Sequence, residues 1–275
     1  MNDVLGALIL GIVQGLTEFA PVSSTAHLAL VPWIFGWQSP LLNSLAFDIA
    51  LHMGTLLATL TYFRSEWLRL IRAGLASIRD RSLAGDPWRR LAWLLVLATI
   101  PGATAGFLLQ SKIESEFRAP WVIGIAMIVM GIVLLAAEKL GDKRLGLFDI
   151  RIGTALAIGL GQAAALIPGV SRSGGTMTAA LFAGVDRESA ARFSFLLATP
   201  IIAGAGLKEV REILHVGTAG DSGLAILVGF VTSAIVGYLC IKYLIRYLQT
   251  GTLYVFVWYR IVVGMGVLAL YLLRG

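Results

Sequence analysis

Cysteine and charged residues are scarce in this chain of 275 residues. Its one cysteine, Cys240, lies inside an apolar run, which excludes a disulfide framework and a metal site built from several cysteines. Charged residues make up 14% of the chain, whereas soluble domains contain about 25%. Hydrophobic residues make up 57%, which excludes disordered, collagen-like and coiled-coil classes. The composition therefore predicts a helical membrane protein with several spans.

Apolar segments long enough to cross a bilayer, which takes about 20 helical residues, occur along the whole chain. We expect six spans, at about 45–63, 91–110, 120–138, 190–207, 223–245 and 254–273. Two further apolar regions, 4–36 and 153–184, are each interrupted by proline, serine and a charged residue. Their arms are too short to cross about 30 Å of hydrocarbon. Each region therefore predicts a re-entrant hairpin of two short helices, and non-helical backbone at that depth predicts a functional site.

The basic residues predict on which side of the membrane each loop lies. Residues 64–90 contain seven basic and three acidic residues, and loops rich in Lys and Arg are cytoplasmic. Alternating the spans from this loop places fifteen of the 22 basic residues inside and both termini outside. The predicted outer segments 111–119 and 208–222, with the C-terminus, carry five. The net charge of +6 thus indicates orientation and gives no reason to expect a nucleic-acid partner.

Each half of the chain consists of one broken region followed by three spans. Because three is odd, residues 1–138 would start outside and residues 139–275 inside, which is the pattern of an inverted-topology repeat. The two interruptions also share proline, serine and an upstream glutamine, Gln14 or Gln162. We therefore expect a single all-α membrane domain, 1–275, in which two re-entrant hairpins meet tip to tip near the membrane midplane.

The second interruption combines two glycines with several polar side chains just before an apolar helix. These polar residues are Ser171, Arg172, Ser173 and Thr176. A helix N-terminus with glycines and hydroxyl groups can bind anions, and the planar guanidinium of arginine matches phosphate oxygens. The pattern favours a phosphate-binding cradle. The alternative is a serine-capped helix whose Arg172 pairs with Glu18 for stability only.

The first interruption offers complementary chemistry. Gln14 and Glu18, four residues apart, share a helical face, and Ser24 and His27 follow. Oxygen ligands suit Mg²⁺ or Ca²⁺, which would bridge to phosphate. His27 is a candidate general acid or base, and Ser24 a candidate nucleophile or donor. The alternative is that Ser23 or Ser24 only caps the helix and His27 has no catalytic role.

Other polar residues within the apolar segments are secondary candidates. We expect Asp48 and His52, four residues apart, to be a helix-packing pair or to support the site from behind. Arg260 in the last span either extends toward the membrane surface or braces the cytoplasmic half of the core. Ser23 and Gln162 complete this secondary set.

The runs Gln14–His27 and Pro168–Thr176 resemble the signatures of bacterial undecaprenyl-diphosphate phosphatases of the bacitracin-resistance type. The resemblance covers essentially the whole chain and includes Phe47-Asp48, His52-Met53-Gly54-Thr55 and Tyr259-Arg260. It implies an integral enzyme of the bacterial plasma (inner) membrane that removes the terminal phosphate of undecaprenyl diphosphate. The product would be the lipid carrier used for peptidoglycan and other envelope polymers, and the active site would face outward.

The resemblance also implies a role for individual residues. Glu18 and Gln14 would bind the divalent cation, and Ser24 and His27 would take part in catalysis. The diphosphate would be held by Ser171, Arg172, Ser173 and Thr176. Many members have glutamate where this chain has Gln14, which lowers the ligand charge and affects the metal preference. We expect Ser24, deprotonated with help from His27, to attack the terminal phosphorus, and water then to hydrolyse the phosphoenzyme; attack by His27, or by water activated by Glu18, stays open.

A transporter or flippase for an anionic lipid phosphate is the rival function, because paired broken helices in inverted repeats are typical of transporters. The sequence places a candidate nucleophile, a candidate base and a metal-binding carboxylate opposite Arg172. Binding an anion does not require all of these groups, so their presence favours hydrolysis. The expected partners are the lipid substrate and membrane lipids. The oligomeric state stays open, with a homodimer among the options.

Overall fold

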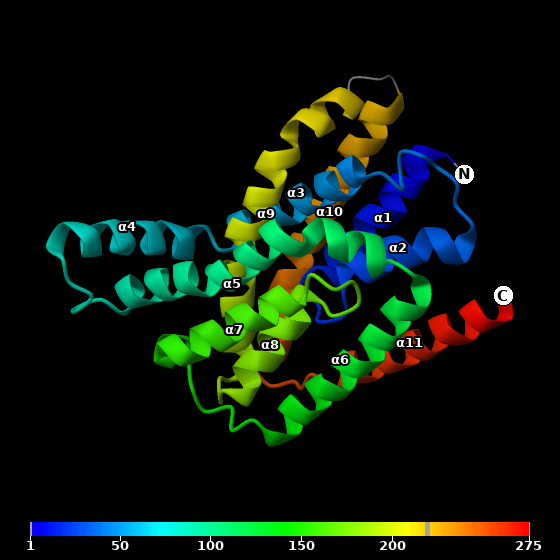
Figure 1. Ribbon diagram of the computed structural model, residues 1–275. Coiled ribbons are helices and arrows are strands. Elements are labelled where there is room, and N and C mark those ends of the chain that lie inside the picture. The colour runs from blue at the N-terminus through cyan, green and yellow to red at the C-terminus, as the bar shows by residue number, and fades with distance from the viewer. Residues whose placement is uncertain (1, 218–220, 275) are drawn as a thin grey trace.

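Helices form all of the regular secondary structure in the described part of the chain (Figure 1). The computed structural model describes residues 2–217 and 221–274, without the side chains of 110–112, 114–116, 208–217 and 221–222. The elements are α1 (Asp3–Thr17), α2 (Ser24–Phe35), α3 (Leu45–Tyr62), α4 (Arg64–Asp80), α5 (Pro87–Glu116), α6 (Pro120–Leu140), η1 (Leu147–Asp149), α7 (Ile152–Ala164), α8 (Arg172–Phe182), α9 (Arg187–Gly217), α10 (Asp221–Leu248) and α11 (Tyr254–Arg274).

Six of the described helices are long and apolar enough to cross a membrane, as predicted. Their apolar parts are Leu45–Tyr62, Pro87–Leu109, Pro120–Leu140, Arg187–Leu207, Gly223–Leu248 and Tyr254–Arg274. Two of them begin earlier than expected because polar caps precede the apolar run. The Asp86 carboxylate accepts a hydrogen bond from the N–H of Trp88 at 2.9 Å and starts α5. Asp186 accepts from the N–H of Ser189 at 2.8 Å and starts α9.

The two interrupted regions are pairs of short helices joined by non-helical turns, as the sequence indicates. α1, α2, α7 and α8 contain 15, 12, 13 and 11 residues, which gives lengths of about 17–22 Å at 1.5 Å per residue. Both turns end in a serine with positive φ, 77° at Ser23 and 74° at Ser171. Each serine accepts a hydrogen bond from the N–H three residues later and caps the helix that follows.

Each short-helix pair packs against a long helix from the other half of the chain. α1 lies along α10, and α7 lies along α5. Glycines permit this close approach: a Cβ on Gly11 would lie 2.9 Å from the carbonyl oxygen of Gly229 on α10. A Cβ on Gly159 would lie 2.5 Å from the carbonyl oxygen of Ala98 on α5. The short helices are therefore held inside the bundle by long helices far away in sequence.

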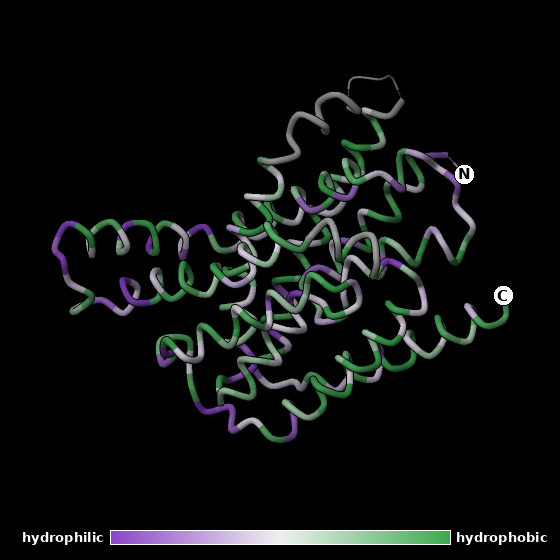
Figure 2. The backbone as a smooth tube through the Cα atoms, in the orientation of Figure 1, coloured by the Kyte–Doolittle hydropathy of each residue, from purple (hydrophilic) through white to green (hydrophobic). Residues whose placement is uncertain are grey.

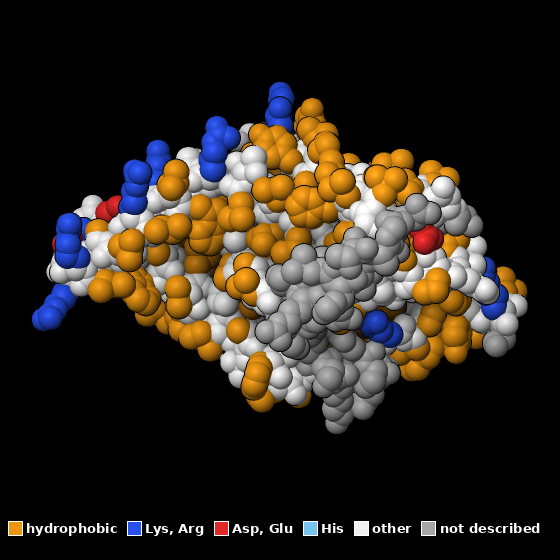
Figure 3. Space-filling view, turned by 90° about the horizontal axis from the view of Figure 1, so that it is seen from above, with side chains coloured by type: hydrophobic (Ala, Val, Ile, Leu, Met, Phe, Trp, Pro, Cys, Tyr) orange, Lys and Arg blue, Asp and Glu red, His pale blue; other side chains and the backbone are white. Residues whose placement is uncertain are grey.

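α4 and the first turns of α5 form an arm that extends from the body of the molecule, on the left in Figure 1. Hydrophilic residues concentrate at the far end of this arm and in the segment between α6 and α7, whereas the long helices are mostly hydrophobic (Figure 2). Basic side chains along the arm are visible in Figure 3. The predicted outer segment 208–222 includes 218–220, which lie outside the described residues.

Candidate active site

The two interruptions lie against each other at the centre of the molecule (Figure 1). The N–H of Gly169 donates to Ser23 Oγ at 3.2 Å, and Ser173 Oγ donates to the carbonyl oxygen of Ala20 at 3.0 Å. Each contact joins residues about half the chain length apart. The two turns are thus in direct contact, and polar groups from both halves of the chain gather around them.

Glu18 is the centre of this polar cluster. Its carboxylate is buried and forms a salt bridge through Oε1 with the guanidinium of Arg172. Oε2 accepts hydrogen bonds from Ser24 Oγ at 2.6 Å and from Gln14 Nε2 at 3.0 Å. His52 Nε2 lies 3.6 Å from the same oxygen. A buried carboxylate requires such partners, so this cluster combines a compensated negative charge with a hydroxyl in direct contact.

His27 has partners other than the expected Ser24. Its Nδ1 lies 2.7 Å from the carbonyl oxygen of Ser23, and its Nε2 lies 2.7 Å from the hydroxyl oxygen of Tyr259. Since a carbonyl only accepts, Nδ1 carries a proton, and when the ring is neutral Nε2 accepts from the Tyr259 hydroxyl. The two rings are stacked with centroids 5.6 Å apart. The expected Ser24–His27 pairing is therefore wrong for this structure, because the turn at Ser23 directs Ser24 toward Glu18.

The polar residues of the second interruption form a capped helix N-terminus. Ser171 Oγ accepts from the N–H of Gly174 at 3.0 Å and lies 3.1 Å from Ser173 Oγ. The first intrahelical bond of α8 runs from the N–H of Gly175 to the carbonyl of Ser171 at 2.8 Å. The N–H groups of Arg172 and Ser173 thus have no acceptor within the helix. This end of α8 combines two backbone donors, the helix dipole and a guanidinium.

Arg260 connects the two interruptions from behind. Its side chain is fully buried in α11 and donates from Nη1 to the carbonyl of Pro21 at 2.8 Å. Nη2 donates to the carbonyls of Gly169 at 2.6 Å and Val170 at 3.0 Å. Of the two expectations for Arg260, extension toward the surface is wrong. The residue braces the core, and it does so at the contact between the two turns.

Comparison with known proteins shows the family to which this chain belongs. A family model described as "Bacitracin resistance protein BacA" matches residues 7–266. The chain belongs to this family. It is 50% identical over 275 residues to an "Undecaprenyl-diphosphatase" of Desulforudis audaxviator, with all of both chains covered. It is 50% identical over 267 residues to one of Pelotomaculum thermopropionicum (97% of this chain, 96% of that one) and 44% identical over 272 to one of Moorella thermoacetica (98% and 99%).

Three of the remaining predicted residues of this BacA-family chain have other neighbours in the structure. Thr176 Oγ1 donates to the carbonyl of Arg172 at 2.7 Å and lies 2.6 Å from Ser194 Oγ, so its hydroxyl connects α8 to α9. Gln162 is buried beside Gly102 of α5, and no hydrogen bond to its amide is seen among the described residues. The carbonyl of Asp48 lies 2.7 Å from His52 Nδ1 and orients that ring toward Glu18.

Two residues of the cluster were undervalued or missed by the sequence analysis. His52, expected as part of a helix-packing pair, reaches Glu18 directly. The sequence presents Tyr259 only as part of the family signature, whereas its hydroxyl lies 2.7 Å from His27 Nε2 across 232 residues of sequence. In the sequence, the feature that could have pointed to Tyr259 is its position next to Arg260, a charged residue inside an apolar span. The BacA-family site thus draws on α1, α2, α3, α8 and α11.

A divalent cation would have few protein ligands in this BacA-family site. No group of three or more His, Cys, Asp or Glu that could hold a metal is found among the residues the structure describes. Gln14 Oε1, however, is buried without a hydrogen-bond partner in that part of the chain, and it lies beside the Glu18 carboxylate. Mg²⁺ is often held by one or two carboxylates with substrate phosphates. Glu18 and Gln14 therefore fit such an ion if the diphosphate supplies further oxygens.

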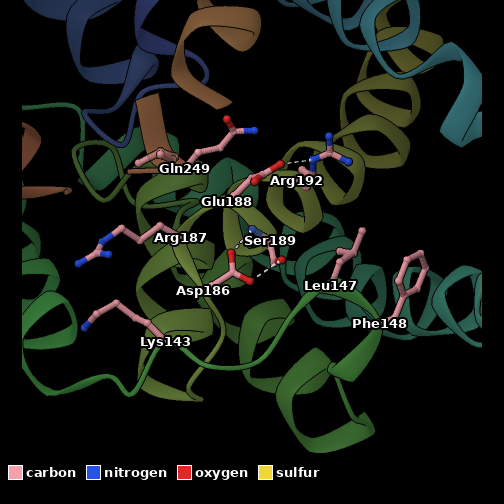
Figure 4. A pocket seen from close by; sticks show the side chains of 10 residues that line it. Lys143, Leu147, Phe148, Asp186, Arg187, Glu188, Ser189, Arg192 and Gln249 are labelled. Atoms are coloured by element: carbon pink, nitrogen blue, oxygen red, sulfur yellow. Dashed lines mark hydrogen bonds and ion pairs between the residues drawn. The ribbon is translucent and has the colours of Figure 1, made fainter. Parts of the chain in front are cut away.

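One pocket lies away from this cluster. It has a volume of about 490 Å³ and is lined by α9 and the segment before α7, with Lys143, Arg187 and Arg192 among its residues (Figure 4). These charges already have partners: Arg187 binds Glu138, Arg192 lies 3.1 Å from Glu188, and Lys143 donates to two carbonyls. An apolar pocket of about 480 Å³ instead adjoins the second interruption at Ile167 and Val170.

Proposed function

We propose that this chain is an undecaprenyl-diphosphatase, a membrane hydrolase that converts undecaprenyl diphosphate to undecaprenyl phosphate and inorganic phosphate. This reaction recycles the lipid carrier for cell-wall synthesis. The observation that carries the proposal is 50% identity, over the full length of both chains, to a protein of that name. The cluster of Glu18, Ser24 and Arg172 agrees with it, because hydrolysis needs a nucleophile and a base beside an anion-binding group. The relatives support hydrolysis over the rival transporter.

The proposed binding mode uses the N-terminal end of α8. The guanidinium of Arg172 and the N–H groups of Arg172 and Ser173 bind the diphosphate, with Ser171 and Ser173 shaping the turn. In the structure Arg172 pairs with Glu18. A bound diphosphate would interact with the same guanidinium while that pair is kept. Thr176 acts through its contact with Ser194 and is a positioning residue. The negative charge that develops on the transferred phosphoryl group is thus met by fixed donors.

The proposed chemical step begins at Ser24. Its Oγ attacks the terminal phosphorus while its proton passes to Glu18 Oε2, the oxygen to which it donates at 2.6 Å. The bond to the bridging oxygen breaks, and undecaprenyl phosphate leaves. Glu18 passes this proton to the departing undecaprenyl phosphate and becomes a base again. It then takes a proton from the water that attacks the phosphoserine and returns it to Ser24 Oγ as the P–O bond breaks, which releases inorganic phosphate. Direct attack by water activated by Glu18 is the alternative route, whereas His27 is committed to Ser23 and Tyr259 and is proposed to position the turn.

We propose a divalent cation, Mg²⁺ or Ca²⁺, as the cofactor. The Glu18 carboxylate and Gln14 Oε1 would hold it together with diphosphate oxygens. A bound cation would neutralise charge on the diphosphate and polarise its phosphoryl oxygens. Removal of divalent cations with a chelator should then abolish activity, and titration with each metal should identify the preferred one. Full activity in excess chelator would contradict this proposal.

The membrane arrangement that we propose follows the inverted-repeat pattern. The shared serine φ values and the crossed packing of α1 on α10 and α7 on α5 support two related halves, 1–138 and 139–275. In this arrangement α1–α2 and α7–α8 are re-entrant hairpins in the bacterial plasma membrane. Both termini and the site face outward. Cysteine labelling from each side of the membrane tests this, and labels at residues 3 and 273 that react only from the cytoplasm would contradict it.

We further propose that the apolar pocket at Val170 receives the first part of the prenyl chain. Trp121, Ile125 and Val129 of α6 form its outer wall, and Val170 precedes Ser171 directly. A Val129→Trp substitution in this wall should raise KM for undecaprenyl diphosphate and leave hydrolysis of a short-chain prenyl diphosphate unchanged. Equal effects on both substrates would contradict the assignment.

Phosphate release from undecaprenyl diphosphate by the purified protein in detergent tests the main proposal. Activity should require no membrane gradient, and Ser24→Ala should lose it. Phosphate trapping separates the two routes, because the serine route forms a phosphoenzyme in the wild type that Ser24→Ala lacks, whereas direct attack by water forms none. A phosphoenzyme that persists in Ser24→Ala excludes the serine route. Substrate movement in sealed vesicles without phosphate release would favour the transporter instead.

A further inference from the structure

α4 has an exposed apolar face that no other described part of the chain covers. Its buried side packs on α5 through Leu70, Ala73 and Ser77. Leu68, Ile71, Leu75 and Ile78, which are 54–64% exposed, form a separate row. Their spacing of three, four and three residues places them on one helical face. Four large side chains left exposed in one row indicate a binding surface.

Arginines border this apolar row. Arg69, Arg72 and Arg79 are exposed on α4, at helical positions to one side of the row. Figure 3 shows basic side chains along one edge of the arm and apolar side chains on the surface beside them. Among the described residues, Arg72 forms no salt bridge. Arg79, in contrast, pairs with Asp80, which also binds Arg89, and hydrogen bonds from these two arginines hold the pKa of Asp80 below its usual range. The apolar row therefore faces outward next to at least one positive charge that the protein does not neutralise.

The position of α4 in the chain places this surface at the membrane boundary. Only Phe63 separates α4 from the end of the apolar helix Leu45–Tyr62, and the next apolar helix begins at Pro87. Both ends of the 64–86 segment are thus fixed to ends of membrane-spanning helices. An amphipathic helix with arginines beside an apolar face binds the interface of a bilayer and prefers anionic lipids.

We propose that α4 lies in the headgroup region of the membrane, with its apolar row inserted among the lipids and its arginines bound to anionic headgroups. The arm then fixes the inclination of α5 in the bilayer, because Trp93 Nε1 of α5 donates to Ser77 Oγ of α4 at 2.8 Å. The alternative is that a second copy of this chain covers the same apolar row in a homodimer.

Spin labels on the full-length protein distinguish these occupants. In a Cys240→Ala background, one label is attached at Leu75→Cys on the row and another at Ala76→Cys, about 100° around the helix on the side of the arginines. The proteins are reconstituted in vesicles of phosphatidylcholine with phosphatidylglycerol. The row label should be several-fold more accessible to oxygen than to a water-soluble nickel complex, and the Ala76→Cys label should show the reverse. Phosphatase activity in detergent confirms that both variants are folded.

Two results would overturn the proposal. Equal access of the nickel complex to both labels would place the row in water, and a row label shielded from both reagents, with spin–spin broadening between copies, would assign the row to a dimer. Arg69→Gln with Arg72→Gln tests the lipid charge. This pair should lower the oxygen-to-nickel ratio at Leu75→Cys in vesicles with phosphatidylglycerol and leave it unchanged in phosphatidylcholine alone. An equal change in both lipids would exclude anionic headgroups as the ligand.

Discussion

The two interrupted hairpins share a positive-φ serine that caps the second helix, but they have opposite chemistry. In each, a proline precedes a serine with positive φ that caps the following helix. When the serines Ser23 and Ser171 are superimposed in sequence, Gln14 aligns with Gln162. Glu18, however, aligns with Leu166, and Ser24 aligns with Arg172. The first hairpin provides the carboxylate of Glu18 and the hydroxyl of Ser24, and the second provides the positively charged guanidinium of Arg172.

This difference explains why neither hairpin would suffice alone. A buried carboxylate is costly without a partner, and the first hairpin has no cation of its own. The second hairpin has Leu166 at the position equivalent to Glu18, and the amide of its Gln162 has no hydrogen bond in the described part of the chain. The site therefore exists only where the two turns meet, which is also where Arg260 holds both.

The largest effect is expected at the position where the hairpins differ most. Glu18→Gln removes the proposed base and metal ligand, and should lower kcat/KM by about 10²–10⁴-fold. Leu166→Gln, the matched change in the second hairpin, should leave kcat/KM within a few-fold of wild type. Phosphate release measures both. If Leu166→Gln were as damaging as Glu18→Gln, the assigned asymmetry would be wrong.

Arg172→Ala should lower kcat/KM by about 10²–10³-fold, because it removes a fixed donor to the transferred phosphoryl group. Arg172→Lys keeps the positive charge but loses the planar guanidinium with its two parallel donors, so its kcat/KM should lie between those of the wild type and Arg172→Ala. Ser24→Arg, which copies the second hairpin into the first, should not rescue Arg172→Ala, since it also removes the nucleophile. Rescue would show that the halves are interchangeable.

Arg260→Ala tests the element that the hairpins share. Each buried carbonyl left without a donor costs about 1–3 kcal/mol, so the free energy of unfolding in detergent should fall by about 3 kcal/mol or more. Arg274→Ala is the matched control. Arg274 likewise donates to backbone carbonyls, those of Trp33 and Ile34, but it lies at an exposed helix end. Similar losses for both would contradict a bracing role for Arg260.

Tyr259→Phe removes one neutral hydrogen bond to His27 and should reduce kcat by about two- to tenfold, with little change in KM. The second hairpin has Gly175 at the position of His27 and needs no such partner. Tyr271→Phe on the same helix serves as the control and should have no effect. An unchanged kcat in Tyr259→Phe would show that the orientation of His27 does not matter for turnover.

Gln14→Glu should have the smallest effect. The added carboxylate should reduce the concentration of divalent cation needed for half-maximal activity several-fold, because ligand charge sets the affinity of such sites. Gln162→Glu should produce no gain, since no second carboxylate follows it in α7. Metal titration of phosphate release compares the two. Equal gains would indicate that the ion does not bind at Gln14.

The sequence alone predicted the elements and most of the site because these depend on local patterns. Apolar runs located six long helices, and short arms with central Pro and Ser located the two interruptions. Glu18 and Arg172 were selected because charges within apolar segments are expensive. Helix starts were less accurate, since the caps at Asp86 and Asp186 lie outside the apolar runs.

Tertiary structure alone decided which side chains meet. The partner of Ser24 depends on the positive φ of Ser23, which no pattern of residue types specifies, and the structure pairs it with Glu18. His27 meets Tyr259, and Arg260 meets both turns, across separations set by how long helices pack. Local sequence determines where the chain breaks and which residues are costly to bury. Contacts between distant helices determine how each of those residues is satisfied, and hence which chemistry the site can perform.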